Sequence, residues 1–85
     1  MNKSQIINEI QIERNNQDHK WVGDQSNQSF PFWLTILQEE IGEASMAFLD
    51  RNKDELRKEL IQVVAVGQAM IESLDSGGCW GRENN

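Results

Sequence analysis

Two amphipathic stretches, residues 29–52 and 53–75, determine the architecture of this chain. Within each stretch, apolar side chains recur at steps of three and four residues, which places them along one side of a helix. These positions are Phe30, Leu34, Leu37, Ile41, Ala44 and Phe48 in the first stretch, and Leu56, Leu60, Val63, Gly67, Met70 and Leu74 in the second. The pattern predicts two long helices that pack through these apolar seams.

Local signals indicate where the two helices begin and end. Ser29 starts the first, with Pro31 in the first turn, where its missing N–H costs nothing. Asn52 followed by Glu55 is a capping box for the second, and the adjacent glycines in the tail 76–85 end it. Because the connection between the helices is short, we predict that they are antiparallel neighbours.

The first 28 residues predict a short helix and a polar loop. A helix over 4–15, with Ser4 as its N-cap, carries isoleucines on one side that can cover the long helices. The segment 16–28 is polar and contains Gly23, which indicates a loop. The expected fold is therefore an all-α single domain, 1–85, built from a short N-terminal helix and an antiparallel hairpin of long helices.

Size and charge limit the partners of such a domain. An 85-residue chain buries only about 60% of its unfolded surface, so we expect copies to associate and complete a core of the four-helix-bundle type. The net charge of −6 argues against a nucleic-acid duplex as partner. No stretch approaches the roughly 18 apolar residues that span a membrane. A single cysteine, Cys79, fits a reduced compartment, and we expect a cytoplasmic protein.

A second stripe, one position round from each seam, carries acidic side chains. Glu40 and Glu43 stand three residues apart in the first helix, and Glu59 and Gln62 repeat this spacing in the second. Residues three apart share a helix face. With the turn near 51–53, the antiparallel helices place Glu43 level with Glu59 and Glu40 level with Gln62. The spacing therefore predicts a cluster of three carboxylates and one amide.

Carboxylates beside apolar seams need a neutralising partner, because like charges repel and burial disfavours the charged form. Mg²⁺ prefers oxygen ligands and is the cation that best fits this set, with Mn²⁺ as a substitute. A di-iron site would need Glu-x-x-His motifs, and zinc would need Cys or His ligands; neither pattern is present on these helices. The alternative is a solvated acidic face with no ligand.

The strings QEEIGEASMAFLD and ELRKELIQVVAVGQAMIE, with ERNNQDHKW upstream, resemble the MazG-like family of all-α nucleoside triphosphate pyrophosphohydrolases. The family signature is E-E-x-x-E followed on the next helix by E-x-x-D, and the resemblance covers residues 13–72. It implies Mg²⁺-dependent cleavage of a nucleoside triphosphate to the monophosphate and pyrophosphate. By this resemblance Glu40, Glu43 and Glu59 are metal ligands and Glu39 is the leading glutamate. Gln62 stands where the pattern has Asp, which leaves the number of metals open.

The remaining site residues are candidates for catalysis and substrate contact. Glu39 or Glu40 could accept the proton of the attacking water. Lys20, Arg57 and Lys58 are candidates for phosphate contact, and Trp21 or Trp33 for packing on the base or sugar. Trp21 could instead cover the hydrophobic core.

Two functions from different classes remain open on the sequence. The resemblance implies an enzyme that assembles as a dimer or as a dimer of dimers, and we expect a homotetramer. Because Gln62 replaces an acidic residue, the alternative is a helical interaction or nucleotide-binding module that has little or no turnover.

Overall fold

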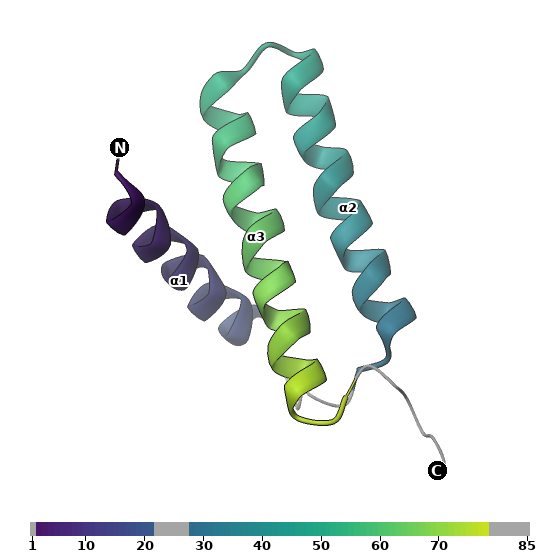
Figure 1. Ribbon diagram of the computed structural model, residues 1–85. Helices are drawn as coiled ribbons and strands as arrows, with labels where there is room; N and C mark the ends of the chain where they lie inside the picture. Colours follow the sequence, from purple (N-terminus) through teal and green to yellow (C-terminus); the bar gives the residue numbers. More distant parts are fainter. Residues whose placement is uncertain (1, 22–27, 79–85) are drawn as a thin grey trace.

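The computed structural model describes residues 2–21 and 28–78, which form three α-helices and no strand. They are α1 (Lys3–Lys20), α2 (Phe30–Leu49) and α3 (Lys53–Asp75). Helices α2 and α3 form an antiparallel hairpin, and α1 lies obliquely along the side of α3 that faces away from α2 (Figure 1). The predicted all-α fold is confirmed for this part of the chain. None of these helices is both long and apolar enough to cross a bilayer.

The turn of the hairpin explains why the two helices lie antiparallel. Arg51 has a φ of 57°. Its N–H donates to the carbonyl oxygen of Phe48 at 3.0 Å, and the N–H of Asn52 donates to the carbonyl oxygen of Ala47 at 3.0 Å. These are the hydrogen bonds of a Schellman motif. The side chain of Asn52 then accepts from the N–H of Glu55 at 3.0 Å and caps α3. One helix therefore ends and the next begins within three residues, 50–52.

The far ends of the hairpin also follow the sequence signals. The Ser29 side chain accepts from the N–H of Phe32 at 3.4 Å, and Pro31 lies in the first turn of α2. Helix α3 ends at Asp75. Two residues later, Gly77 adopts a φ of 90°, which glycine accepts without strain. The predicted bounds of the long helices are thus confirmed to within a few residues. Most of the predicted tail, including Cys79, lies outside the described residues.

The stripe that lies inside the hairpin coincides only in part with the predicted seams, whose members Leu37 and Met70 pack against the core. The buried core is formed by Trp33, Val66 and Ala69, with Ala44, Ala47 and Ala65 also buried. Seam residues Phe30, Ile41, Phe48, Leu60 and Leu74 are exposed. The stripe with the small residues and the glutamates faces inward because alanines allow two helices to approach closely. The prediction that the helices pack through these apolar seams is therefore confirmed only for part of each seam and is wrong for the exposed residues.

Helix α1 is longer than predicted, and a different face of it is buried. It continues to Lys20 instead of ending near residue 15, and its buried side chains are Arg14 and Gln17, whereas Ile7 and Ile12 are exposed. Asn2, not Ser4, is its N-cap. Tertiary contacts are made by the extra turns and the residue that follows them, because Gln17 is buried and Trp21 packs on Trp33 of α2.

Candidate metal centre

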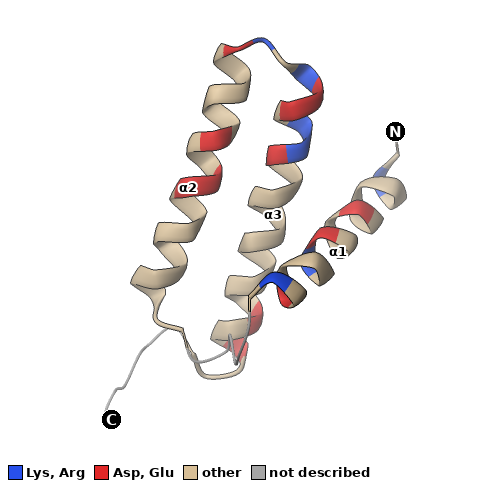
Figure 2. Cartoon of the chain, turned by 180° about the vertical axis from the view of Figure 1, so that it is seen from behind, with Lys and Arg blue, Asp and Glu red and all other residues tan. Residues whose placement is uncertain are grey.

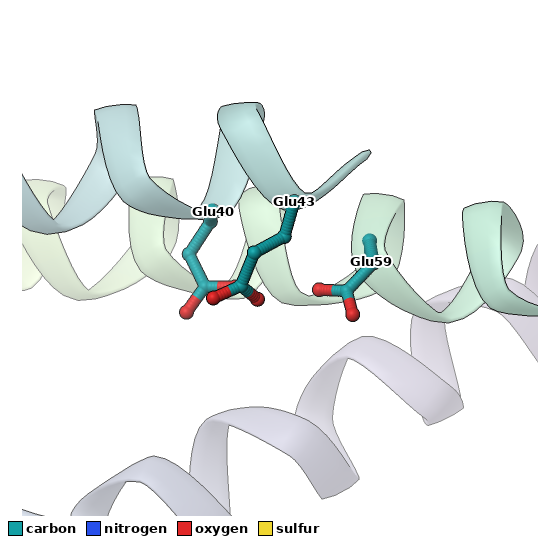
Figure 3. Close-up of side chains that lie close together, drawn as sticks. All are labelled: Glu40, Glu43 and Glu59. Atoms are coloured by element: carbon teal, nitrogen blue, oxygen red, sulfur yellow. The ribbon is translucent and has the colours of Figure 1, made fainter. Parts of the chain in front are cut away.

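Three glutamates from the two long helices converge at one point of the hairpin. Glu40 and Glu43 of α2 and Glu59 of α3 each offer a carboxylate oxygen, and these oxygens lie within 4.8 Å of one another. Figure 3 shows the three side chains directed to the same side of the hairpin. The level pairing predicted from the helix rise is confirmed, whereas a role in metal binding stays a prediction.

Gln62 completes the cluster as the fourth polar side chain. With its amide nitrogen directed inward, it donates to Glu40 Oε1 at 2.8 Å and to Glu59 Oε1 at 3.1 Å. The amide is placed this way because an inward oxygen would face two carboxylate oxygens. Gln62 therefore links the acidic residues of α2 and α3.

Burial gives this cluster unusual proton affinity. Glu59 is 7% exposed, and this burial raises its pKa to about 7, with hydrogen bonds to Glu55 and Glu43 and the negative charges of both adding to the effect. The pKa of Glu40 is also raised, first by burial and then by the charge of Glu43, while Lys20 acts in the opposite direction. The two carboxylates thus lie in an environment that favours a proton or a cation.

Two further glutamates that the sequence analysis did not assign to the site flank the cluster. Glu55 of α3 stands one turn before Glu59 and hydrogen bonds to it, and the charge of Glu13 of α1 acts on Glu40. The i, i+4 spacing of Glu55 and Glu59 is a signal that could have identified Glu55. Glu13 carries no such signal, because its position depends on how α1 docks. Figure 2 shows Asp and Glu in the middle of α2, along α1 and at the start of α3, where Lys and Arg also lie.

The other predicted polar residues lie around the cluster, not in it. Glu39 is exposed and is not a member of the three-glutamate group, because successive helical residues point about 100° apart. Lys20, the last residue of α1, is close enough for its charge to act on Glu40. Lys58 lines a depression of about 250 Å³ between α1 and α3, which Glu13 also lines.

Trp33 lies in the core, and this position does not suit its predicted contact with a base or sugar. Its side chain is 0% exposed, so neither ring face is open to a ligand. Trp21 is half-buried and packs edge-on against Trp33, with 5.6 Å between ring centroids. This is the alternative in which Trp21 covers the core. Hydrophobic periodicity alone could not tell whether Trp33 lies in the core or faces a ligand, because both stripes of α2 begin with an aromatic residue.

The donor set fits a hard divalent cation. Oxygen ligands of Mg²⁺ lie about 2.1 Å from the metal and therefore up to about 4.2 Å from one another. The carboxylate oxygens, which lie within 4.8 Å, would reach this spacing by small side-chain rotations. Gln62 can add a carbonyl oxygen, and no Cys or His belongs to this group. The chemistry of the group therefore favours Mg²⁺ or Mn²⁺ over zinc.

Gly42, which lies between the two glutamates of α2, has no close neighbour in the chain. A Cβ atom built on it would meet nothing within 4 Å. Within a single chain, this glycine is therefore not needed for close packing.

Comparison of the chain with family models, with curated proteins and with solved structures finds no match.

Proposed function

We propose that this protein is a Mg²⁺-dependent nucleoside triphosphate pyrophosphohydrolase, which releases a nucleoside monophosphate and pyrophosphate. The observation that carries the proposal is the convergence of Glu40, Glu43 and Glu59 from two helices, with Glu59 buried. Carboxylates at this spacing, one of them buried, are unfavourable unless a proton, a hydrogen-bond donor or a cation compensates them. The E-E-x-x-E pattern of residues 39–43 adds the resemblance to the MazG-like family.

Each side chain has a role in this proposal that its position supports. Glu40, Glu43 and Glu59 would hold the cation, which when bound neutralises charge on the phosphate oxygens. Glu40 is better placed than the exposed Glu39 to accept a proton from the attacking water, because Glu40 belongs to the group of carboxylates that would hold the cation. Lys20 would contact a phosphate near Glu40, and Lys58 would do so from the depression between α1 and α3.

Self-association is part of the proposal. A groove of about 500 Å³ on the hairpin is lined mainly by apolar side chains, among them Ile41, Phe48, Leu49 and Leu60, which are 47–68% exposed. A contiguous apolar surface of this kind is typical of an interface. A second copy of the hairpin that covers this groove would make a four-helix bundle, and two such dimers would make the expected tetramer.

The first experiment tests the reaction. Purified protein is incubated with Mg²⁺ and a panel of ribo- and deoxynucleoside triphosphates, and pyrophosphate, phosphate and nucleotide products are measured. We expect monophosphate and pyrophosphate in equal amounts, with Mn²⁺ able to replace Mg²⁺. Glu43→Gln should lower the rate by more than the roughly 100-fold that loss of an outer-sphere partner can cost. Asp50→Asn, at the C-cap of α2, is the matched control and should retain activity.

Gln62 favours a second candidate function, a nucleotide-binding or interaction module that has little or no turnover. Its amide already donates to Glu40 and Glu59, so the cluster is partly satisfied without a cation. If no nucleotide yields pyrophosphate and Mg²⁺ leaves the thermal stability unchanged, this second candidate replaces the first. Nucleotide binding by calorimetry would then separate a nucleotide-binding module from a protein–protein interaction module.

A further inference from the structure

The terminal amide of Gln62 has two useful orientations at the position that it occupies. With the nitrogen inward, it donates to Glu40 Oε1 at 2.8 Å and to Glu59 Oε1 at 3.1 Å. A half-turn about the last side-chain bond would place the carbonyl oxygen at the same point, because the two ends of an amide have nearly the same size. A carboxylate at position 62 has no N–H and could offer oxygen only.

These orientations suit different states of the cluster. Without a cation, an inward nitrogen supplies two donors to carboxylates that otherwise repel each other, whereas an inward oxygen would add a third acceptor. With a divalent cation among the carboxylates, oxygen is the ligand atom and the N–H groups, which carry partial positive charge, are repelled. The favoured orientation therefore depends on whether a cation is bound.

We infer that Gln62 is a positioning residue that donates to Glu40 and Glu59 in the metal-free protein and turns its carbonyl oxygen inward when a divalent cation binds. The second half of this inference rests on the proposed function, because it requires the cation. The first half concerns the protein alone. In the metal-free protein, the two hydrogen bonds of Gln62 hold the carboxylates of the cluster together. Because cation binding must break these bonds, we expect the natural protein to bind the cation more weakly than a variant with an acidic residue at position 62.

Nuclear magnetic resonance of the side-chain amides tests the reorientation directly. The Gln62 resonance is assigned by its loss in Gln62→Glu. In the metal-free protein we expect its amide protons to exchange slowly with water, and saturating Mg²⁺ should shift the resonance and accelerate exchange by roughly tenfold or more. Gln68 is the internal control, because its amide bonds to Gln11 and Glu72 outside the cluster and should not respond. Slow exchange that persists in the Mg²⁺-bound protein, or fast exchange before Mg²⁺ is added, would overturn the inference.

Thermal unfolding gives an independent readout. In chelator, Gln62→Met should lower the Tm by roughly 5–10 °C, which is more than Gln68→Met, because loss of the donors leaves carboxylates facing each other. Gln62→Glu should also lower the metal-free Tm, but it should show a larger rise than the natural protein when Mg²⁺ is added. Equal metal-free losses for Gln62→Met and Gln68→Met would contradict the donor role.

The two proposals fail in different ways. If Mg²⁺ changes neither the resonances nor the Tm, the proposed function and the turning of the amide are both wrong. The donor role of Gln62 is then decided by the metal-free comparison of Gln62→Met with Gln68→Met. If Mg²⁺ binds and Gln62 does not respond, only the inference about Gln62 is wrong.

Discussion

At the scale of single residues, the carboxyl group of Glu59 lies in an environment very different from water. Its pKa is raised from 4.5 to about 7 by burial and by its acidic neighbours, so the folded chain binds a proton more tightly than the unfolded chain does. The stabilisation that results is fully present below about pH 4.5 and is lost as the pH rises through about 7. Glu9 acts in the opposite direction, because its hydrogen bonds with Arg57 lower its pKa and its contribution is lost at acidic pH.

We therefore expect the metal-free protein to become less stable as the pH rises from about 5 to about 8. Glu59→Gln, which carries no charge at either pH, should flatten this dependence, and Glu39→Gln, in an exposed residue outside the cluster, should leave it unchanged. Calorimetric unfolding at the two pH values in chelator is the measurement. A pH dependence in Glu59→Gln as steep as that of the natural protein would show that other groups cause it.

The cluster was predictable to a different degree for each of its residues. Glu40, Glu43, Glu59 and Gln62 were brought together correctly because the rise of a helix is fixed and a short turn sets the level of each residue. The positions of Glu13 and Lys20 relative to Glu40 were not predictable, because they depend on how α1 docks on the hairpin. The burial of Trp33 was also missed, since periodicity finds two adjacent apolar stripes and does not say which of them faces inward.

Among the elements of the fold, the turn between α2 and α3 is the one on which the cluster depends. Arg51 adopts a φ of 57°, which is uncommon for residues other than glycine, asparagine and aspartate. Its guanidinium also lies over the Phe48 ring, with 5.1 Å to the ring centroid. Because this turn sets the heights of the two helices, a change in its geometry would move Glu43 relative to Glu59.

Arg51→Val should therefore destabilise the protein by about 1–3 kcal/mol, because a β-branched residue is strained at positive φ. Arg51→Gly should be close to neutral, since glycine accepts this conformation but loses the contact with Phe48. Chemical unfolding of both variants measures the difference. Equal stability of the two variants would show that the turn does not keep this conformation in solution.

The helix bounds were predictable wherever a cap signal was local. Ser29 and Asn52 accept from N–H groups only three residues away, and these ends of α2 and α3 were placed correctly. The C-terminal end of α1 was placed five residues too early, near 15 instead of Lys20. Residues 16–20 are polar and lack apolar periodicity, and their helical form depends on contacts with the hairpin.

For the whole molecule, the exposed apolar groove indicates how copies would associate. Phe48 lines the groove and is 54% exposed, whereas Met46 is 59% exposed and does not line it. If the proposed assembly uses this groove, Phe48→Glu should reduce the mass measured by light scattering toward the 9.8 kDa of one chain. Met46→Glu, which adds the same charge to the same helix, should retain the oligomer. A natural protein that is already monomeric would contradict self-association.

Helix α1 is attached to α3 partly through polar side-chain contacts, so we expect α1 to open at a lower free energy than α3. Arg57 Nη1 lies 2.6 Å from Glu9 Oε1, and Gln11 Nε2 donates to Gln68 Oε1 at 2.7 Å. The side chains of Arg57 and Glu9 are 39% and 33% exposed, and dissolved salt weakens such exposed ion pairs. Amide hydrogen exchange should therefore show α1 opening well before α3, and more readily at high ionic strength. Uniform protection of α1 and α3 would contradict this order. Lys20 belongs to α1, so opening of α1 at high salt would move this positive charge away from the acidic cluster. An anionic substrate would then approach the cluster less readily as the ionic strength rises.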